Sequence, residues 1–478
     1  MPSAIPKDEP LNVAIIGAGI AGITLALGLL RRKIPFTIYE RAPSFREIGA
    51  GIGFSPNAER AMGSLSPECL SAFKKVANPN GEDYFQWVIG HPLLSNNKNN
   101  VSSPSDKEVE DHNKLLFKLH VGKDGFQGSR RSDILEAWAK LIPSSHIKFG
   151  KEVDTITDGY PGSISPITIK FKDDTEATAS LVIGCDGIRS RVRQHILSKS
   201  SPAGGVAAAV NPGYTSKYCF RALVPMASAT QSIGEHLSSR RFMYNGPGAH
   251  VITYPVGQNS FLNILVVISD SPSNKTWPHA THTAPGTKSE ALAAFESWNP
   301  TVRRIVNLLP DDGLEKWALF DMAAHPAPTY TKGRVAIAGD AAHATGPHLG
   351  AGGGLGVEDA LCLSGLLEAV KHDLESPSSS SSSSGGPSKQ AYQASNTTMM
   401  MMIEKALQAY NDVRYERTQW VVRATREAAD LFQWADERGK DPDQFGREIT
   451  ERFHKIWHYD VDEMVDEAVK AYRKQFVS

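Results

Sequence analysis

The chain has 478 residues, of which 41% are hydrophobic and 22% charged, and its formal net charge at pH 7 is −1. These values fit a globular protein of about two domains, and the near-neutral charge disfavours nucleic acid or an anionic membrane as a partner. The four cysteines form no C-x-x-C pair, so neither a zinc site nor a redox dithiol is expected. Such thiols suit a reducing, cytoplasmic compartment, and neither a secretory signal nor a membrane span is expected.

The first 40 residues have the pattern of a β-α-β unit. Residues 12–16 are apolar and predict a buried strand, residues 20–30 predict a helix, and residues 36–39 predict a second strand. The spacing of these elements is about the 30 residues that such a unit takes.

A glycine motif lies between the first strand and the helix. Gly17, Gly19 and Gly22 form G-x-G-x-x-G, and Glu40 follows the second strand. Glycines there permit a tight turn and bring the backbone close to a pyrophosphate at the helix N-terminus. The glutamate can accept hydrogen bonds from ribose hydroxyls and would repel a 2′-phosphate. The motif therefore predicts a dinucleotide, and FAD or NAD rather than NADP.

The residue pattern changes twice in the middle of the chain. Residues 90–111 are polar and predict a long loop, whereas residues 129–139 have the apolar spacing of an amphipathic helix. From residue 214 onward the pattern becomes β, which predicts a second domain. The strands expected there are residues 219–225, 242–244, 251–256 and 261–268.

A late strand at residues 334–338 is followed by a second glycine-rich stretch. Asp340 comes at the strand end, where its carboxylate could bind a ribityl hydroxyl. The glycines precede a helix that begins near Leu355, and its N-terminal amides could hold a flavin oxygen that becomes negative on reduction.

The last part of the chain contains a run of seven serines at residues 378–384 and four methionines at residues 399–402. The serine run predicts a flexible linker. The methionines are expected to start or pack a long helix at residues 403–435, not to bind a ligand.

The order and spacing of these motifs resemble the class A flavoprotein aromatic hydroxylases. The matching segments are the first glycine motif, residues 185–187 with Asp-Gly, residues 339–340 with Gly-Asp, residues 347–352 with Pro-x-x-Gly-x-Gly, and residues 358–360 with Glu-Asp-Ala. The resemblance covers residues 13–415. Within the family the chain looks similar to salicylate hydroxylases and to fungal polyketide dearomatases of azaphilone and tropolone pathways.

The resemblance implies an α/β fold with a discontinuous Rossmann-like FAD-binding domain, a β-rich substrate domain and C-terminal helices. The expected segments are 1–83, 119–210 and 329–375 for the FAD-binding domain, 84–118 and 211–328 for the substrate domain, 376–402 for a serine-rich linker, and 403–478 for C-terminal helices.

The family's cofactor contacts map onto Glu40, Gly53, Arg131, Asp340 and Gly353. NADPH or NADH is expected as a transient reductant, since no second Rossmann unit is visible. The expected partners are a phenolic small molecule and O2.

The dearomatases hold a phenolate with an arginine and a tyrosine, which match Arg221 and Tyr254. Ala351 stands where the family usually has glutamine, and His343 is expected to be a structural residue beside the flavin. The implied reaction is hydroxylation of a resorcinol-type polyketide ring with dearomatisation, in secondary metabolism. A salicylate-type decarboxylating hydroxylase is the alternative, and a flavin halogenase would carry a Trp-x-Trp-x-Ile-Pro stretch that this sequence lacks.

Overall fold

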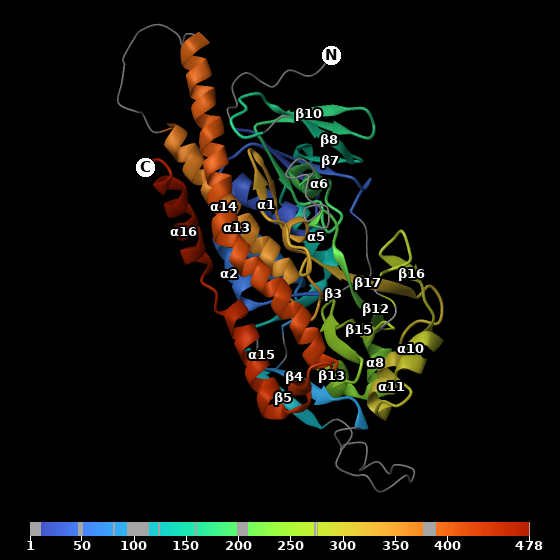
Figure 1. The fold of residues 1–478 in the computed structure, drawn as a ribbon. Coiled ribbons are helices and arrows are strands. Elements are labelled where there is room, and N and C mark those ends of the chain that lie inside the picture. Colours follow the sequence, from blue (N-terminus) through green and yellow to red (C-terminus); the bar gives the residue numbers. More distant parts are fainter. Residues whose placement is uncertain are drawn as a thin grey trace, which may run out of the picture.

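The computed structural model describes residues 11–45, 51–79, 82–92, 114–122, 125–157, 160–197, 209–271, 274, 276–375 and 389–477. Within these residues a six-stranded sheet forms one layer and an eight-stranded sheet forms another. Long C-terminal helices run along both layers (Figure 1). This is the α/β fold that the sequence predicts.

The six-stranded sheet has the order β18-β19-β11-β1-β2-β7 and is parallel except at β18. All four residues of β1 are buried, as expected for a parallel strand covered on both faces. The strands are β1 Val13–Ile16, β2 Phe36–Glu40, β7 Ile147–Phe149, β11 Leu181–Gly184, β18 Thr331–Lys332 and β19 Val335–Ile337.

Helices from distant parts of the chain pack with this sheet around one core. Two smaller sheets lie beside it, β8-β9-β10 and β3-β6. The helices are α1 Ile20–Arg31, α2 Pro56–Leu65, α3 Pro67–Val76, α5 Arg131–Ala139, α6 Arg191–Leu197, α12 Asp340–His343 and α13 Gly352–Glu375. The strands are β3 Gly51–Phe54, β6 Gln127–Arg130, β8 Val153–Thr157, β9 Ile167–Phe171 and β10 Glu176–Ala179.

The eight-stranded sheet has the order β16-β17-β12-β15-β14-β13-β4-β5 and is mostly antiparallel. We call it the substrate sheet, after the substrate domain that is expected from the sequence. Its central strands are those predicted from the β pattern after residue 214. The strands are β4 Tyr84–Ile89, β5 Leu115–His120, β12 Gly213–Pro225, β13 Phe242–Gly246, β14 Ala249–Val256, β15 Phe261–Ser269, β16 Thr283–Pro285 and β17 Glu315–Asp321.

The two faces of the substrate sheet pack against different partners. One face forms a core with short helices, namely α8 Met226–Ile233, α10 Lys288–Ala294 and α11 Pro300–Asn307. The other face packs against the residues just before α13 and against the C-terminal helices. This second face therefore looks toward the glycine-rich stretch after Asp340.

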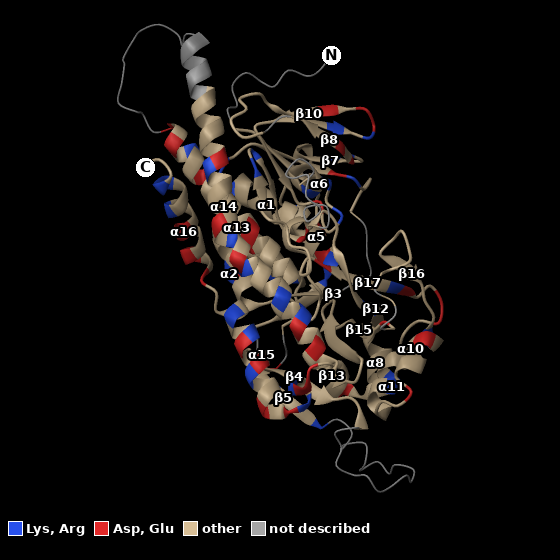
Figure 2. Ribbon diagram, viewed as in Figure 1, with Lys and Arg blue, Asp and Glu red and all other residues tan. Residues whose placement is uncertain are grey.

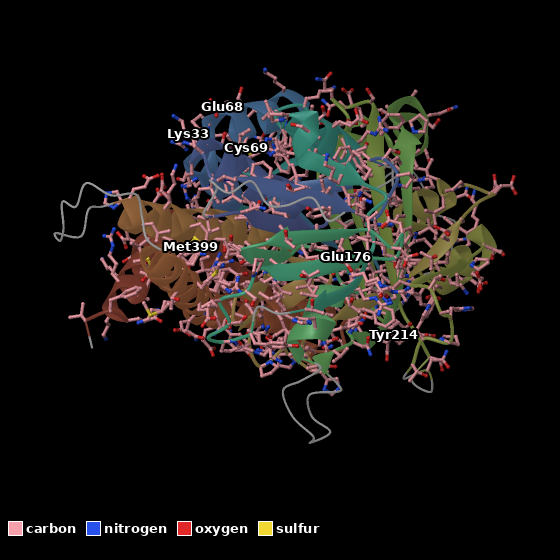
Figure 3. The ribbon with its side chains drawn as sticks, turned by 90° about the horizontal axis from the view of Figure 1, so that it is seen from above. Lys33, Glu68, Cys69, Glu176, Tyr214 and Met399 are labelled. Carbon is pink, nitrogen blue, oxygen red and sulfur yellow. The ribbon has the colours of Figure 1, made fainter. Side chains whose placement is uncertain are left out.

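Helix α14 spans Lys389–Phe432 and contacts both layers, and it is followed by α15 Pro442–Trp457 and α16 Val461–Lys474. It starts earlier than the predicted helix at residues 403–435, so residues 389–402 belong to α14 and not to a linker. Met399 and Met400 are buried in the core, which explains the extension. Met399 lies with the C-terminal helices, far from Tyr214 at the start of β12 (Figure 3).

The serine run and most of the polar segment at residues 90–111 lie outside the described residues. Deleting residues 378–384 is expected to leave the melting temperature and FAD content nearly unchanged, because a serine homopolymer cannot bury apolar surface. Thermal unfolding of the purified deletion variant checks this. A drop of several degrees would show that the segment docks on the protein.

Charges are interspersed over both layers in the view of Figure 2. All four cysteines are free and buried. In the described residues, no cluster of His, Cys, Asp and Glu could hold a metal ion. No described helix is both long and apolar enough to traverse a bilayer.

Candidate active site

A cavity of about 1350 Å³ runs between the first β-α-β unit and the substrate sheet. It exceeds the roughly 300–1000 Å³ of a site for a drug-sized ligand, so it suits a larger molecule such as a dinucleotide. Its lining includes Gly17, Gly19, Glu40 and Arg131, together with Trp317 of β17. Four residues of the predicted cofactor site therefore share one cavity with a strand of the substrate sheet.

The glycine motif forms a tight turn at the cavity wall. Gly17 has φ +102°, and a Cβ there would lie 2.5 Å from the carbonyl oxygen of Cys185. A Cβ on Gly22 would lie 2.0 Å from the carbonyl oxygen of Gly17, whereas one on Gly19 would meet only Arg131, at 4.0 Å. Gly17 and Gly22 are thus required by the turn itself. Gly19 leaves open space at the start of α1, where a pyrophosphate could approach.

Glu40 is fixed by the backbone of the same turn. Its Oε2 accepts a hydrogen bond from the amide of Ala18 at 2.7 Å, and its Oε1 accepts one from Ala42 at 2.8 Å. A carboxylate has about four acceptor positions, so two remain for ribose hydroxyls. The side chain lines the cavity, which places these acceptors where a ligand can reach them.

Arg131 and Asp340, both predicted cofactor contacts, are close enough to interact electrostatically. Burial lowers the pKa of Arg131, while Asp340 acts in the opposite direction. Burial raises the pKa of Asp340, and its interactions with His343 and Arg131 oppose that shift. The Asp340 side chain is nevertheless exposed to solvent, so a ligand hydroxyl can reach its carboxylate. Asp340 does not itself line the large cavity.

Asp340→Ala is expected to weaken FAD binding by about 10- to 150-fold, the loss of one hydrogen bond to a charged group. The fold should persist, because Asp340 is an exposed residue at the start of α12. FAD titration of the apoprotein measures the effect, with Asp154→Ala on the exposed surface of β8 as the control. An unchanged affinity would remove Asp340 from the site.

Gly53 and Gly353 lie outside the large cavity, where β3 meets the N-terminus of α13. A Cβ on Gly53 would lie 2.1 Å from the ring of Phe126, and one on Gly353 would lie 3.2 Å from Ile52. Phe126 also leaves no room for a side chain at Gly350, where a Cβ would lie 3.1 Å from the ring. These close contacts bring β3 and the loop before α13 together.

Arg221 lies on β12 with its guanidinium 3.7 Å from the centre of the Trp317 ring. Its Nε and Nη2 are buried and have no hydrogen-bond partner in the described part of the chain. Burial lowers the pKa of Arg221, while Cys219 and Tyr254 oppose the shift. An unpaired buried guanidinium edge is costly, which indicates that a ligand completes it.

Tyr254 lies on the same face of the substrate sheet as Arg221. Arg221 pairs with Leu265 on β15, Leu265 pairs with Ile252 on β14, and Tyr254 is two residues further along β14. Burial raises the pKa of Tyr254 to about 12, with Arg241 and Arg221 opposing the shift. Tyr254 is therefore a neutral hydroxyl at neutral pH and can donate a hydrogen bond.

His343 does not line the cavity, because it belongs to a buried ionic network behind Asp340. Its Nε2 lies 2.6 Å from Oδ2 of Asp359, which also accepts the amide of Gly339 at 2.8 Å. Arg414 of α14 donates to Asp359 at 2.8 Å and pairs with Glu358 at 2.8 Å. The network fixes the turn that presents Asp340.

Comparison with known proteins identifies the family. Residues 10–377 match the FAD binding domain family. The FAD-dependent monooxygenase pigN of Monascus ruber is 44% identical over 477 residues, which cover 99% of this chain and 100% of the relative. The FAD-dependent monooxygenase orf3 of Aspergillus niger is 43% identical, with 98% of each chain covered. The chain belongs to the FAD-dependent monooxygenases.

A solved salicylate hydroxylase substrate complex is 28% identical to this monooxygenase, with a TM-score of 0.76, and the match covers 97% of this chain and 99% of that one. The fold and the family agree with the resemblance drawn from the sequence. FAD fits the residues present, since the cavity combines an open glycine turn, free acceptors on Glu40, and Arg131 beside Asp340.

Several residues beside the candidate site of this monooxygenase do not stand out in its sequence. The Trp317 ring packs against the guanidinium of Arg221. The guanidinium of Arg241 lies 4.1 Å from the centre of the Phe126 ring and 5.3 Å from that of Tyr254. The apolar run at residues 317–320 could have predicted β17, but nothing in the sequence pairs Trp317 with Arg221. Ala351, in place of the family's glutamine, is buried in the apolar cluster on the substrate sheet.

Proposed function

We propose that this monooxygenase hydroxylates a phenolic ring that Arg221 and Tyr254 hold by its oxygen. The observation that carries the proposal is the buried edge of Arg221, whose Nε and Nη2 have no partner among the described residues. Trp317 supports the guanidinium from one side, and Tyr254 adds a hydroxyl on the same face of the sheet.

Bound FAD would supply the two-electron redox chemistry and the activation of O2. The protein's contribution is to hold the ring in its more nucleophilic form. A phenolate pairs with the guanidinium of Arg221, which lowers the pKa of the bound phenol. Tyr254 remains protonated and donates a hydrogen bond to the same oxygen. Glu40, Arg131 and Asp340 would hold the cofactor from the other layer, with Gly53 and Gly353 at its edge.

We further propose that NADPH or NADH is the reductant and that it binds transiently, since the described strands form only one sheet of the dinucleotide-binding kind. Four free, buried thiols favour a reducing compartment, so we place the enzyme in the cytoplasm. Hydroxylation at a substituted ortho carbon would dearomatise the ring, as the resemblance to polyketide dearomatases implies.

A decarboxylating salicylate-type reaction is the second candidate, and one observation favours it. Nε and Nη2 lie on the same edge of a guanidinium, and such an edge binds the two oxygens of a carboxylate in parallel. A phenolate flanked by an ortho aldehyde offers a similar pair of oxygens. Both substrate types therefore fit the edge, whereas a phenol without an ortho oxygen leaves one donor unpaired.

The test is NAD(P)H consumption with matched substrates, with products identified by mass. An alkylated resorcinol aldehyde, salicylate and a plain alkylphenol separate the two candidates from each other and from an unselective phenol hydroxylase. A product that gains one oxygen and keeps its carbons supports hydroxylation, and loss of CO2 from salicylate supports the second candidate. No stimulation by any of the three phenols would refute the proposal.

A further inference from the structure

Two buried histidines connect the substrate sheet to the loop before α13. His250 lies on β14 and His348 in the loop, and Nε2 of His250 lies 3.3 Å from Nδ1 of His348. Their ring centres are 5.1 Å apart, and the exposed fractions of the two residues are 0% and 3%. One ring must donate and the other accept, so the contact is a directional hydrogen bond between two imidazoles.

The surroundings keep both rings neutral. Burial holds the pKa of His250 well below its ordinary value, and His348 and Lys217 act in the same direction. Burial lowers the pKa of His348 to about 3, again with help from Lys217. Lys217 itself is paired with Asp430 at 3.0 Å. Protonation of both rings would abolish the hydrogen bond, because both facing nitrogens would then be donors.

The pair lies between the loop before α13 and strand β14. His348 is followed by Gly350, with φ +62°, and by Gly352 and Gly353 at the start of α13. His250 lies four residues before Tyr254 on β14, on the same face of the sheet. The hydrogen bond therefore joins the loop on the proposed flavin side to the strand that carries the proposed substrate contact.

Other contacts across this junction are mainly apolar. Leu349 and Ala351 of the loop belong to one cluster with Ile252 and Leu265 of the sheet. Apolar packing is not directional, so it does not fix the loop along the strand as a hydrogen bond does. The second nitrogen of His250, Nδ1, is buried and has no partner among the described residues. The His250 ring is therefore held by its hydrogen bond to His348.

We propose that His250 and His348 are positioning residues, whose hydrogen bond fixes the loop of residues 347–353 against β14 and so sets the approach of the flavin to the bound ring. The part that concerns the ring rests on the proposed function, whereas the part that concerns the flavin does not.

The experiment exploits the shape of amide side chains. The amide of glutamine reaches the position of a histidine Nε2, so His250→Gln can keep the hydrogen bond, while His250→Leu removes it at similar volume. Thr253→Val is the matched control, since Thr253 is fully buried on the same strand but faces the opposite side. For each purified variant we would measure the melting temperature, the Kd of FAD for the apoprotein, the flavin absorption spectrum, and peroxide released per NAD(P)H oxidised.

His250→Leu is expected to raise the Kd of FAD by about two- to tenfold, the range of one buried hydrogen bond. Its flavin spectrum should shift and its peroxide yield should rise. His250→Gln should restore all three, and Thr253→Val should match the wild type. If the leucine variant fails to fold, His348→Asn, whose amide reaches the position of Nδ1, and His348→Leu repeat the comparison from the loop.

Equal values for the leucine and glutamine variants would overturn the proposal, whether both match the wild type or both lose FAD. The first result would show that the hydrogen bond does not affect flavin binding. The second would show that flavin binding depends on the packing of the imidazole ring and not on its hydrogen bond. If no phenol is hydroxylated but the two variants still differ in FAD affinity and spectrum, the proposed function fails and the positioning of the flavin loop stands.

Discussion

Arg221→Ala is expected to lower hydroxylation by about 30- to 1000-fold, while FAD binding persists. The substitution removes a charge-assisted contact in a partly dry site, which costs about 2–4 kcal/mol. Arg221 lies on β12 and is not part of the glycine turn, so the cofactor affinity should change much less than the rate. Single-turnover product formation and FAD titration measure the two effects separately.

Tyr254→Phe provides the comparison within the same site. It removes a hydrogen-bond donor and leaves the positive charge, so the expected loss is smaller. Raising the pH should partly rescue this variant, because bulk base can then ionise the phenol, and should rescue Arg221→Ala less. Arg303→Ala on the exposed surface of α11 is the control. An Arg221→Ala enzyme that forms product at nearly the wild-type rate would refute the assignment of the substrate anchor.

Asp359→Ala is expected to lower the free energy of unfolding by about 3–5 kcal/mol, more than any other substitution proposed for this protein. Asp359 and Arg414 are both fully buried, and the substitution leaves the guanidinium with only Glu358 as a charged partner. It also removes the acceptor for the amide of Gly339, so FAD affinity should fall as well. Thermal unfolding of the apoprotein and FAD titration test both effects.

Asp373→Ala is the matched control on the same helix. Its carboxylate is partly exposed and lies 3.7 Å from Arg473, so its loss should cost less than about 1 kcal/mol. Equal melting temperatures for the two variants would show that the buried ionic network does not stabilise the fold.

The same network predicts how stability depends on pH. Burial alone would raise the pKa of Glu358, but Arg417 and Arg414 outweigh it and lower that pKa from 4.5 to about 2. A carboxyl whose folded pKa is depressed stabilises the protein fully above its unfolded pKa, and this contribution fades as the pH falls toward 2. The melting temperature of the wild type should therefore fall between about pH 5 and pH 2. Glu358→Gln should start lower and lose less over that window.

The parts of the molecule that the sequence predicts best are those in which neighbouring residues determine the structure. The strand 13–16, the glycine turn and helix α1 follow from local pattern and turn sterics, and Glu40 follows from the length of the unit. The central strands of the substrate sheet are likewise predicted by short apolar runs between turns. In these segments the local preference and the tertiary structure agree.

Contacts between distant residues could not be read in the same way. Nothing local relates Arg414 to Asp359, or His250 to His348, because each pair meets only through packing of whole elements. Helix α14 starts earlier than the sequence predicts, because the polar residues before Met399 resemble a linker and only the folded core shows that this methionine is buried. The candidate cofactor and substrate residues come from a family pattern, which pairs positions that local physics leaves unrelated.

The scattered origin of the six-stranded sheet has a consequence for synthesis of the enzyme in the cell. Strand β11 pairs with β1 on one side and with β19 on the other, and Arg414 lies later still in the chain. At about 5–20 residues per second, roughly 20–75 s separate the appearance of Glu40 from that of Arg414 on the ribosome. Throughout that interval the nascent chain exposes an apolar strand edge and lacks the network behind Asp340. A newly made chain is therefore open to aggregation until its own C-terminal helices have been synthesised, so slower translation should lower the yield of folded enzyme.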